Sequence, residues 1–326
     1  MKVFTVFFFV VFTAVIPLQA DTLLDKAINA QKAKEYDKAI KYAEQYLETS
    51  ELDEVSQNYA LFTIGYCYEK KRNPSQAIDY YLRSNKVYKH GDLNANAHVR
   101  IGLVYNNFNL YQEAIEHFNH ALSLNTREAF EGNILIWRAI AYKYISKYDS
   151  ALSDVLKAER IALKDLENRK RLLFNSYAQR GLIKRKMEDY DEAIRFFELA
   201  NDLQIGRNTL INIGGTYHAR GENTKAIEVY KTALASKQHI EQRFKTFQKL
   251  GEIHAEIQLN DVAQTFLKEA EAIYSQVLYP DSEDIDVYHS LAQASKLIGQ
   301  STQYSQFLER GYSIQKERNE MIEAML

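Results

Sequence analysis

The chain has 326 residues, of which 46% are hydrophobic and 26% charged, and its formal net charge is −2 at pH 7. A charge this close to zero argues against a general polyanion-binding protein, so nucleic acid is not an expected partner. The single cysteine, Cys67, cannot form an intramolecular disulfide, and stability therefore has to come from packing. Cys67 lies on an apolar helix face, which favours a buried structural thiol over a reactive one.

Residues 1–20 have the pattern of a secretory signal peptide. Lys2 precedes an apolar run from Val3 to Val15, and cleavage after Ala20 would leave Asp21 as the first residue of the mature chain. The run is shorter than the roughly 20 residues of a membrane-spanning helix. We therefore expect cleavage, no transmembrane segment after it, and an extracytoplasmic location, either periplasmic or secreted.

From residue 21 onward, pairs of small residues recur at an offset of twelve residues. A constant offset within units and a variable spacing between them is typical of stacked helical hairpins, because the closest approach of two paired helices is fixed whereas the turns can vary. Only the last pair has a large residue at its second position. The pairs are Ala27/Ala39, Gly65/Ala77, Gly102/Ala114, Ala139/Ala151, Gly181/Ala193, Gly214/Ala226, Gly251/Ala263 and Ala292/Tyr304.

The residues around each pair favour a helix, a tight turn and a second helix. Apolar residues follow helical spacing, as in Leu61, Ile64 and Tyr68. A side chain suited to a helix start precedes most of the second small positions, where its oxygen or charge can stabilise the first turn. These residues are Asp37, Ser75, Asp149, Asp191, Thr224, Asp261 and Thr302, with Gln112 as the exception.

This pattern resembles the tetratricopeptide repeat. The third unit carries the family's signature as Ile101-Gly102, Tyr105, Ala114, Phe118 and Ala121, and the sixth as Leu210, Ile213-Gly214, Tyr217, Ala226, Tyr230 and Ala233. The eight units cover nearly all of residues 21–319. The resemblance implies an all-α fold, a right-handed α-solenoid superhelix of about eight helical hairpins.

Two departures from the family pattern concern the second helices. The family's proline near their end is replaced by Glu51, Lys89, Thr126, Leu163, Ile205, Gln238, Ser275 and Lys316, so these helices can run on. The step between successive second small positions also varies, and the longest step, 42 residues, leads from Ala151 to Ala193. We expect a division there into an N-terminal part, residues 21–163, and a C-terminal part, residues 164–326, which ends in a capping helix.

No catalytic constellation is recognisable, and we expect no catalytic residues, no cofactor and no enzymatic activity. The strongest metal-like cluster consists of Glu113, Glu116, His117 and His120, which share one helix face. The resemblance makes this helix the outer one of its hairpin, so a solvated polar face is favoured over a metal site. An enzyme of carbohydrate or peptide turnover is the weakest alternative.

The resemblance places a ligand groove along the first helices of the hairpins. Asparagine recurs there at one frame position in four successive units, and its amide can both donate to and accept from the backbone of an extended peptide. A solvated surface is the alternative interpretation. The groove positions hold Tyr59, Phe62, Tyr66, Asn96, Asn106, Asn107, Asn133, Lys143, Asn175, Arg185, Lys186, Asn208, Asn212, His218, Lys245 and Lys249.

Part of a carboxylate-binding motif is present. Family members that bind chaperone tails hold a carboxylate with five residues. Asn212, Lys245 and Lys249 match the last three of those positions, whereas Ala178 and Leu182 occupy the first two and do not match. An acidic peptide is therefore one candidate partner.

Another feature that bears on the partner is a basic stretch from Lys157 to Lys186, which carries ten basic and three acidic residues. It is either a patch for an acidic protein, an anionic glycan or a membrane surface, or it is neutralised by the acidic residues that follow, Glu188 to Glu192.

The favoured function is that of an exported, non-enzymatic scaffold that binds a peptide or protein segment in the concave groove. The alternative is an extracytoplasmic sensory or regulatory module that acts through a separate membrane signalling protein.

Overall fold

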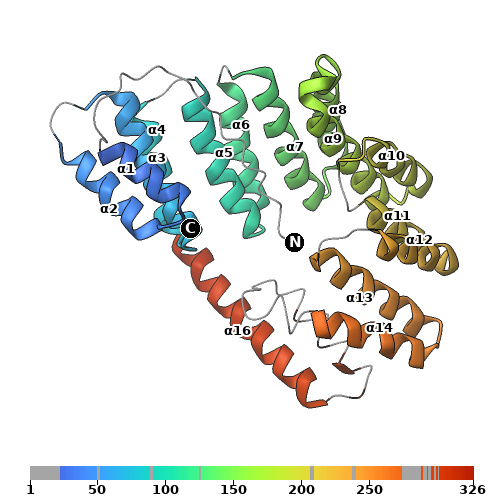
Figure 1. Ribbon diagram of the computed structural model, residues 1–326. Coiled ribbons are helices and arrows are strands. Elements are labelled where there is room, and N and C mark those ends of the chain that lie inside the picture. Colours follow the sequence, from blue (N-terminus) through green and yellow to red (C-terminus); the bar gives the residue numbers. More distant parts are fainter. Residues whose placement is uncertain are drawn as a thin grey trace. The chain divides into compact units, whose positions relative to one another are not determined.

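The computed structural model describes residues 23–49, 52–88, 91–124, 126–205, 209–236, 240–273, 288, 292, 295–296, 299 and 301–326. Within these ranges the chain forms fifteen α-helices and no β-strand, which confirms the all-α prediction (Figure 1). None of the helices searched there is long and apolar enough to cross a membrane. The predicted signal peptide lies outside the described residues.

Helices α1 to α14 follow one another as seven hairpins, as the spacing of small residues predicts. Their bounds are α1 (Leu23–Lys32), α2 (Tyr36–Leu47), α3 (Glu54–Lys70), α4 (Pro74–Val87), α5 (Gly91–Asn107), α6 (Tyr111–Ser123), α7 (Glu128–Tyr144), α8 (Tyr148–Leu163), α9 (Leu166–Lys186), α10 (Tyr190–Asp202), α11 (Thr209–Ala219), α12 (Asn223–Ala235), α13 (Ile240–Glu256) and α14 (Asn260–Ile273). The eighth hairpin lies mainly outside the described residues, apart from α16 (Ser301–Met325), which contains the expected capping segment.

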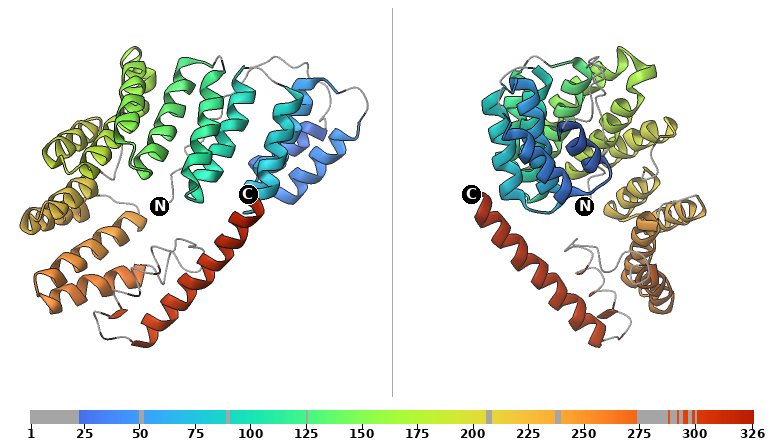
Figure 2. Two further views of the ribbon diagram at one scale, coloured as in Figure 1. Left: turned by 180° about the vertical axis from the view of Figure 1, so that it is seen from behind. Right: turned by 60° about the vertical axis from the view of Figure 1, so that its left-hand side comes forward.

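The helices belong to two compact units. The N-terminal unit contains α1 to α7 with residues 319–326, and the C-terminal unit contains residues 146–318. In the first unit α1, α3, α5 and α7 contact one another in succession, and in the second α9, α11 and α13 do the same (Figure 2). The first helices of the hairpins thus form one layer within each unit. The boundary after Leu163 stays a prediction about domain organisation.

Each hairpin is closed by a small residue that faces a side chain sixteen positions later. A Cβ atom added at Gly102 would lie 2.7 Å from the Phe118 ring, and one added at Gly181 would lie 2.6 Å from the Phe197 ring. Gly65, Gly214 and Gly251 face Tyr81, Tyr230 and Leu267 in the same way. Where the small residue is alanine, the facing residue is smaller, as in Ala27 with Ala43 and Ala139 with Val155, all of them buried. The close approach that the glycines predict is therefore confirmed, and it is matched by the volume opposite.

The turn between paired helices has one conformation throughout. The residue five positions before each second small residue has positive φ: Lys34, Arg72, Asn109, Ser146, Glu188, Gly221 and Gln258. The next residue's backbone N–H reaches back to close the helix, as in Asn73 N to Tyr68 O (2.9 Å) and Asp189 N to Lys184 O (2.9 Å). This is the Schellman ending, in which a left-handed residue lets the last carbonyls be satisfied.

The predicted helix-start residues lie inside the first turn rather than at the cap. Asp37, Asp149, Asp191 and Asp261 are acidic first-turn residues, so they act through their charge on the helix dipole. Side-chain capping bonds occur elsewhere, from Asp53, Asn73 and Asp165.

The longest repeat step is taken up by longer helices. Helix α8 has 16 residues and reaches Leu163, and α9 has 21, with a kink at Arg169 (φ −113°, ψ 15°). Among the other second helices, α6 ends at Ser123 and α10 at Asp202, before the positions at which the family carries proline, whereas α16 runs on through Lys316 to Met325.

The lone cysteine is part of the core of the N-terminal unit. Cys67 is fully buried and packs with Ala39 and Ile64, and burial raises the pKa of its thiol to about 12. The prediction of a structural, unreactive thiol is confirmed in its burial.

Candidate functional site

The predicted groove residues that the structure describes lie on first helices, but they differ in exposure. Tyr66, Asn106 and Lys143 are buried, and Asn107, Lys186 and Lys245 are exposed. Asn208 lies outside the described residues. The remainder are partly buried: Tyr59, Phe62, Asn96, Asn133, Asn175, Arg185, Asn212, His218 and Lys249.

The asparagines are not in equivalent environments. Asn133 donates its side-chain amide to the Ala129 carbonyl of its own helix at 2.8 Å, which uses one of its donors. The Asn106 Oδ1 atom is buried, and no donor in the described chain is bonded to it. Buried amide oxygens are normally satisfied, and among the described residues Asn106 shares this lack of a donor with Asn58 on α3 of the same layer.

A buried polar network joins the second and third repeats, and the predicted site did not include it. Arg100 on α5 donates to Glu69 on α3 through both Nε (2.9 Å) and Nη2, and the Tyr81 hydroxyl donates to the same carboxylate at 2.9 Å. Burial by itself lowers the pKa of the Arg100 guanidinium, but the charges of Tyr81 and Glu69 outweigh it, so the pKa is raised. A sequence signal exists: Glu69 lies four residues after Gly65, and Arg100 lies two before Gly102.

Tyr66 lies beside this network. Its ring centre is 5.3 Å from the Arg100 guanidinium and 5.1 Å from the Lys70 Nζ atom. Burial raises the pKa of the Tyr66 hydroxyl. The ring therefore supports two cations and stays neutral, and it is available for packing rather than for proton transfer.

The basic stretch is partly paired within the C-terminal unit. Arg180 bonds to Glu159 at 2.6 Å, and Lys184 bonds to Asp189 at 2.8 Å. The acidic residues that follow the stretch mostly pair elsewhere, since Asp191 bonds to Arg220 and Glu192 to Arg195. Local neutralisation is thus incomplete.

Histidines of the metal-like cluster on α6 contact a histidine of α5. His117 meets His98 of the preceding helix, with their Nδ1 atoms 3.1 Å apart, and the His98 ring also stacks on His120. Burial lowers the pKa of both His98 and His117 to about 4, and the neighbouring imidazoles add to the shift. In the part of the chain that the structure describes, no group of three or more His, Cys, Asp and Glu residues is arranged to hold a metal ion.

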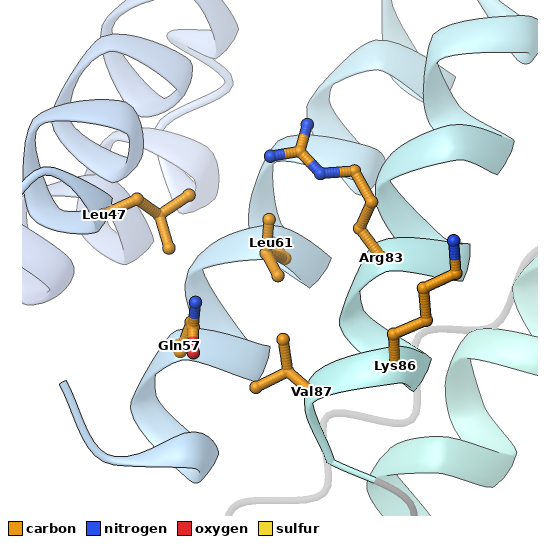
Figure 3. Close-up of a pocket in the computed structure, with 6 residues that line it drawn as sticks. All are labelled: Leu47, Gln57, Leu61, Arg83, Lys86 and Val87. Atoms are coloured by element: carbon orange, nitrogen blue, oxygen red, sulfur yellow. The ribbon is translucent and has the colours of Figure 1, made fainter.

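A shallow hollow of about 320 Å³ lies outside the predicted groove, between α2, α3 and α4. Figure 3 shows apolar side chains from these three helices around it, with two cationic side chains on α4. Arg83 is held near Asp79 at 3.7 Å and over the Tyr80 ring. The lining residues are Leu47, Gln57, Leu61, Arg83, Lys86 and Val87.

The sequence of this chain matches models of one known protein family. Three family models, each described as tetratricopeptide repeat, match residues 24–85, residues 95–127 and 174–204, and residues 209–243. The chain is a tetratricopeptide repeat protein. The matches fall on helical hairpins in both units. Proteins of this family are generally non-enzymatic, and the architecture is that of a protein–protein interaction scaffold.

Solved structures of the same fold have low sequence identity. A tetratricopeptide repeat protein from Parabacteroides merdae has a TM-score of 0.66 and 14% identity, with 83% of this chain and 97% of that one covered. The apo form of RapI has a TM-score of 0.65 and 14% identity, with 91% and 86% covered. A Rap protein complexed with competence and sporulation factor has a TM-score of 0.54 and 17% identity, with 94% and 90% covered. A search of curated protein sequences found no match.

Within this tetratricopeptide repeat protein, one of the two lysines of the half-matched carboxylate clamp is already paired. Lys249 bonds to Glu252 of its own helix, and Lys245 is exposed on α13. Asn212 is partly buried on α11, and its backbone carbonyl accepts hydrogen bonds from Thr216 (2.8 Å) and Arg185 (3.4 Å). Arg185 is thus the basic residue that lies against Asn212.

Proposed function

We propose that this protein is an exported, non-enzymatic scaffold that binds an extended segment of a partner protein along the first helices of its hairpins. The first helices contact one another in succession within each unit, so site residues of neighbouring repeats share one layer. An extended segment that lies on this layer can contact several repeats at once. A protein of the same fold, a Rap protein, has been solved with a bound factor, which supports a binding role.

The observation that carries the proposal is the Asn106 amide oxygen. It is buried at a predicted groove position and lacks a donor in the described chain. A backbone N–H of a bound segment would supply that donor, and leaving the oxygen unsatisfied disfavours the empty state. Asn96 and Asn133 belong to the same layer, on α5 and α7.

Photocross-linking in the organism that encodes the chain tests the binding face. A benzophenone amino acid at Asn133 or Asn175, on first helices, should capture the same partner, whereas one at Glu198, exposed on the second helix α10, should not. Asn106→Ala should weaken capture from Asn133. Equal capture from Glu198, or no capture from either asparagine position, contradicts the proposal. A membrane signalling protein as the captured partner would point to the sensory role.

Export has a separate test. The mature chain, isolated from the cell envelope or the medium, should begin at Asp21 when its N-terminus is sequenced. A chain that still begins at Met1 in the cytoplasm contradicts export but leaves the binding proposal standing.

A further inference from the structure

Arg185 is a partly buried cation with little to balance it. It lies in the last turn of α9, and its Nη1 atom donates to the Asn212 carbonyl at 3.4 Å, a long hydrogen bond. The Thr216 hydroxyl already donates to the same oxygen at 2.8 Å. No Asp or Glu of the described chain forms an ion pair with Arg185.

A glycine lets the Arg185 guanidinium and the Tyr230 hydroxyl approach α11 closely. A Cβ atom at Gly215 would lie 3.0 Å from Arg185 Nη1 and 3.3 Å from the Tyr230 hydroxyl oxygen. Gly214, not Gly215, makes the close approach to the Tyr230 ring that the repeat requires. Gly215 therefore has a different role: it allows two hydrogen-bond donors, the Arg185 guanidinium and the Tyr230 hydroxyl, to lie against the same point of α11.

Three acidic residues around Arg185 are already engaged. Glu252 on α13 accepts from Gln248 at 2.8 Å and pairs with Lys249. Asp189 pairs with Lys184, and Glu256 with His218. None of these carboxylates is left to neutralise Arg185.

The N-terminal unit shows the same frame positions with their charge balanced. Four residues after the small residue of the second repeat stands Glu69, and it binds Arg100, which stands two residues before the next small residue. In the fifth and sixth repeats the equivalent positions hold Arg185 and Asn212. The N-terminal unit thus has a carboxylate, Glu69, to balance its arginine at these frame positions, and the C-terminal unit has none there for Arg185, although the helices pair in the same way.

The two arginines differ accordingly in their electrostatics. The pKa of Arg100 is raised by its partners, whereas burial lowers the pKa of the Arg185 guanidinium and the opposing effect of Tyr230 does not offset it. An arginine stays protonated in either place, so the desolvation of Arg185 is an uncompensated cost in the free protein.

We propose that Arg185, with the Tyr230 hydroxyl as a second donor, binds a carboxylate of the partner segment. The inference rests on the proposed function, since it names the group that the segment places between the fifth and sixth repeats. Guanidinium and carboxylate match in geometry, and the bound carboxylate would do for Arg185 what Glu69 does for Arg100.

The test uses the full chain and a library of random twelve-residue peptides displayed on phage. Peptides selected on the wild type should share an Asp or Glu, or a free C-terminus, at a fixed position. Replacing that Asp or Glu by its amide, or amidating the C-terminus, distinguishes the two sources. Binding of the fluorescein-labelled peptide should weaken at least about tenfold on Arg185→Gln. The amide peptide should lose no further affinity on that variant.

Arg195→Gln is the matched control, because Arg195 is an exposed arginine of α10 that already pairs with Glu192. It should leave peptide affinity within about twofold of the wild type. Affinity for Arg185→Gln within the same range, or selected peptides without a shared carboxylate, overturns the inference while the proposed function stands. Failure to select any peptide counts against both.

A ligand-free measurement separates this role from a structural one. Because Arg185 has no acidic partner in the described chain and only one long hydrogen bond, to the Asn212 carbonyl, Arg185→Gln should leave the melting temperature unchanged or raise it. Arg100→Gln removes the guanidinium that Glu69 binds and should lower the melting temperature. An equal drop for both variants would show that Arg185 belongs to the core, and would overturn the inference.

Discussion

At the scale of single residues, the hairpins depend on matched volumes across sixteen positions. Glycine stands opposite an aromatic ring or leucine in five of the described hairpins, and in the other two an alanine is followed sixteen positions later by a buried alanine or valine. The twelve-residue offset in the sequence shows where the helices approach, but the matching depends on a side chain four residues further on.

Gly102→Ala should destabilise the protein by about 1–2 kcal/mol. The new methyl group would lie 2.7 Å from the Phe118 ring, and overpacking outweighs the better helix propensity of alanine. Urea unfolding followed by circular dichroism measures the loss. Gly102→Ala combined with Phe118→Val copies the Ala139/Val155 hairpin and should be more stable than the sum of the two single changes. If the effects of the two single changes on the free energy of unfolding simply add, the idea that the two side-chain volumes are matched is wrong.

The His98 and His117 pair should make stability depend on pH. Both have a pKa of about 4 in the fold, below the ordinary value of 6.5, so the unfolded chain binds more protons between these values. Stability contributed by the neutral pair is present above pH 6.5 and is lost as pH falls toward 4, by about 1–2 kcal/mol after allowance for partial solvation.

Urea unfolding at pH 7.0, 5.5 and 4.5 checks this dependence. His98→Gln with His117→Gln should flatten the profile, whereas His218→Gln, at a histidine paired with Glu256, should not remove the same loss. A double variant that loses stability as steeply as the wild type would show that other groups, such as carboxylates, dominate.

The candidate site was predictable in its location and not in its chemistry. The repeat frame places Tyr66, Asn106 and Arg185 on first helices, because that frame is set by small residues visible in the sequence. The Glu69–Arg100 pair joins residues 31 positions apart, and the missing acid at Arg185 depends on which neighbours have already taken each carboxylate. Neither is visible without the packing of successive repeats.

At the scale of elements, the hairpin turn tolerates a backbone conformation that most side chains disfavour. Six of the seven left-handed turn residues in the described hairpins are not glycine. The paired helices and the bond that closes each turn hold this residue in place. Composition alone therefore hides the turns, although their place follows from the offset.

Glu188→Gly should raise the free energy of unfolding by about 0.5–1 kcal/mol. Glu188 has a φ of 62°, which glycine adopts without the steric cost of a Cβ atom. Thermal or urea unfolding measures the gain. As control, Glu198→Gly, in the exposed interior of α10, should lose about 1 kcal/mol. A loss at Glu188 would mean that its side chain supports the turn.

At the scale of the whole molecule, stability should be nearly a sum over neighbouring hairpins. Gly102→Ala and Gly214→Ala lie in different units and share no neighbour, so their effects should add within about 0.5 kcal/mol. Gly65→Ala and Gly102→Ala lie in adjacent repeats, where Tyr81 packs with Ile101, and should couple more strongly. Urea unfolding of the single and double variants measures both couplings. A coupling of more than about 1 kcal/mol between Gly102→Ala and Gly214→Ala would contradict the expected additivity.

The sixteen-residue spacing of the matched pairs also bears on how the chain acquires its fold. The contacts between the small residue and the side chain opposite it join residues only sixteen positions apart. The two helices of a hairpin can therefore pack together without a distant segment of the chain. Low sequence separation of contacts favours fast folding. A chain that emerges N-terminus first, whether from a ribosome or across a membrane, can thus complete one hairpin and offer its apolar edge to the next as soon as that one appears.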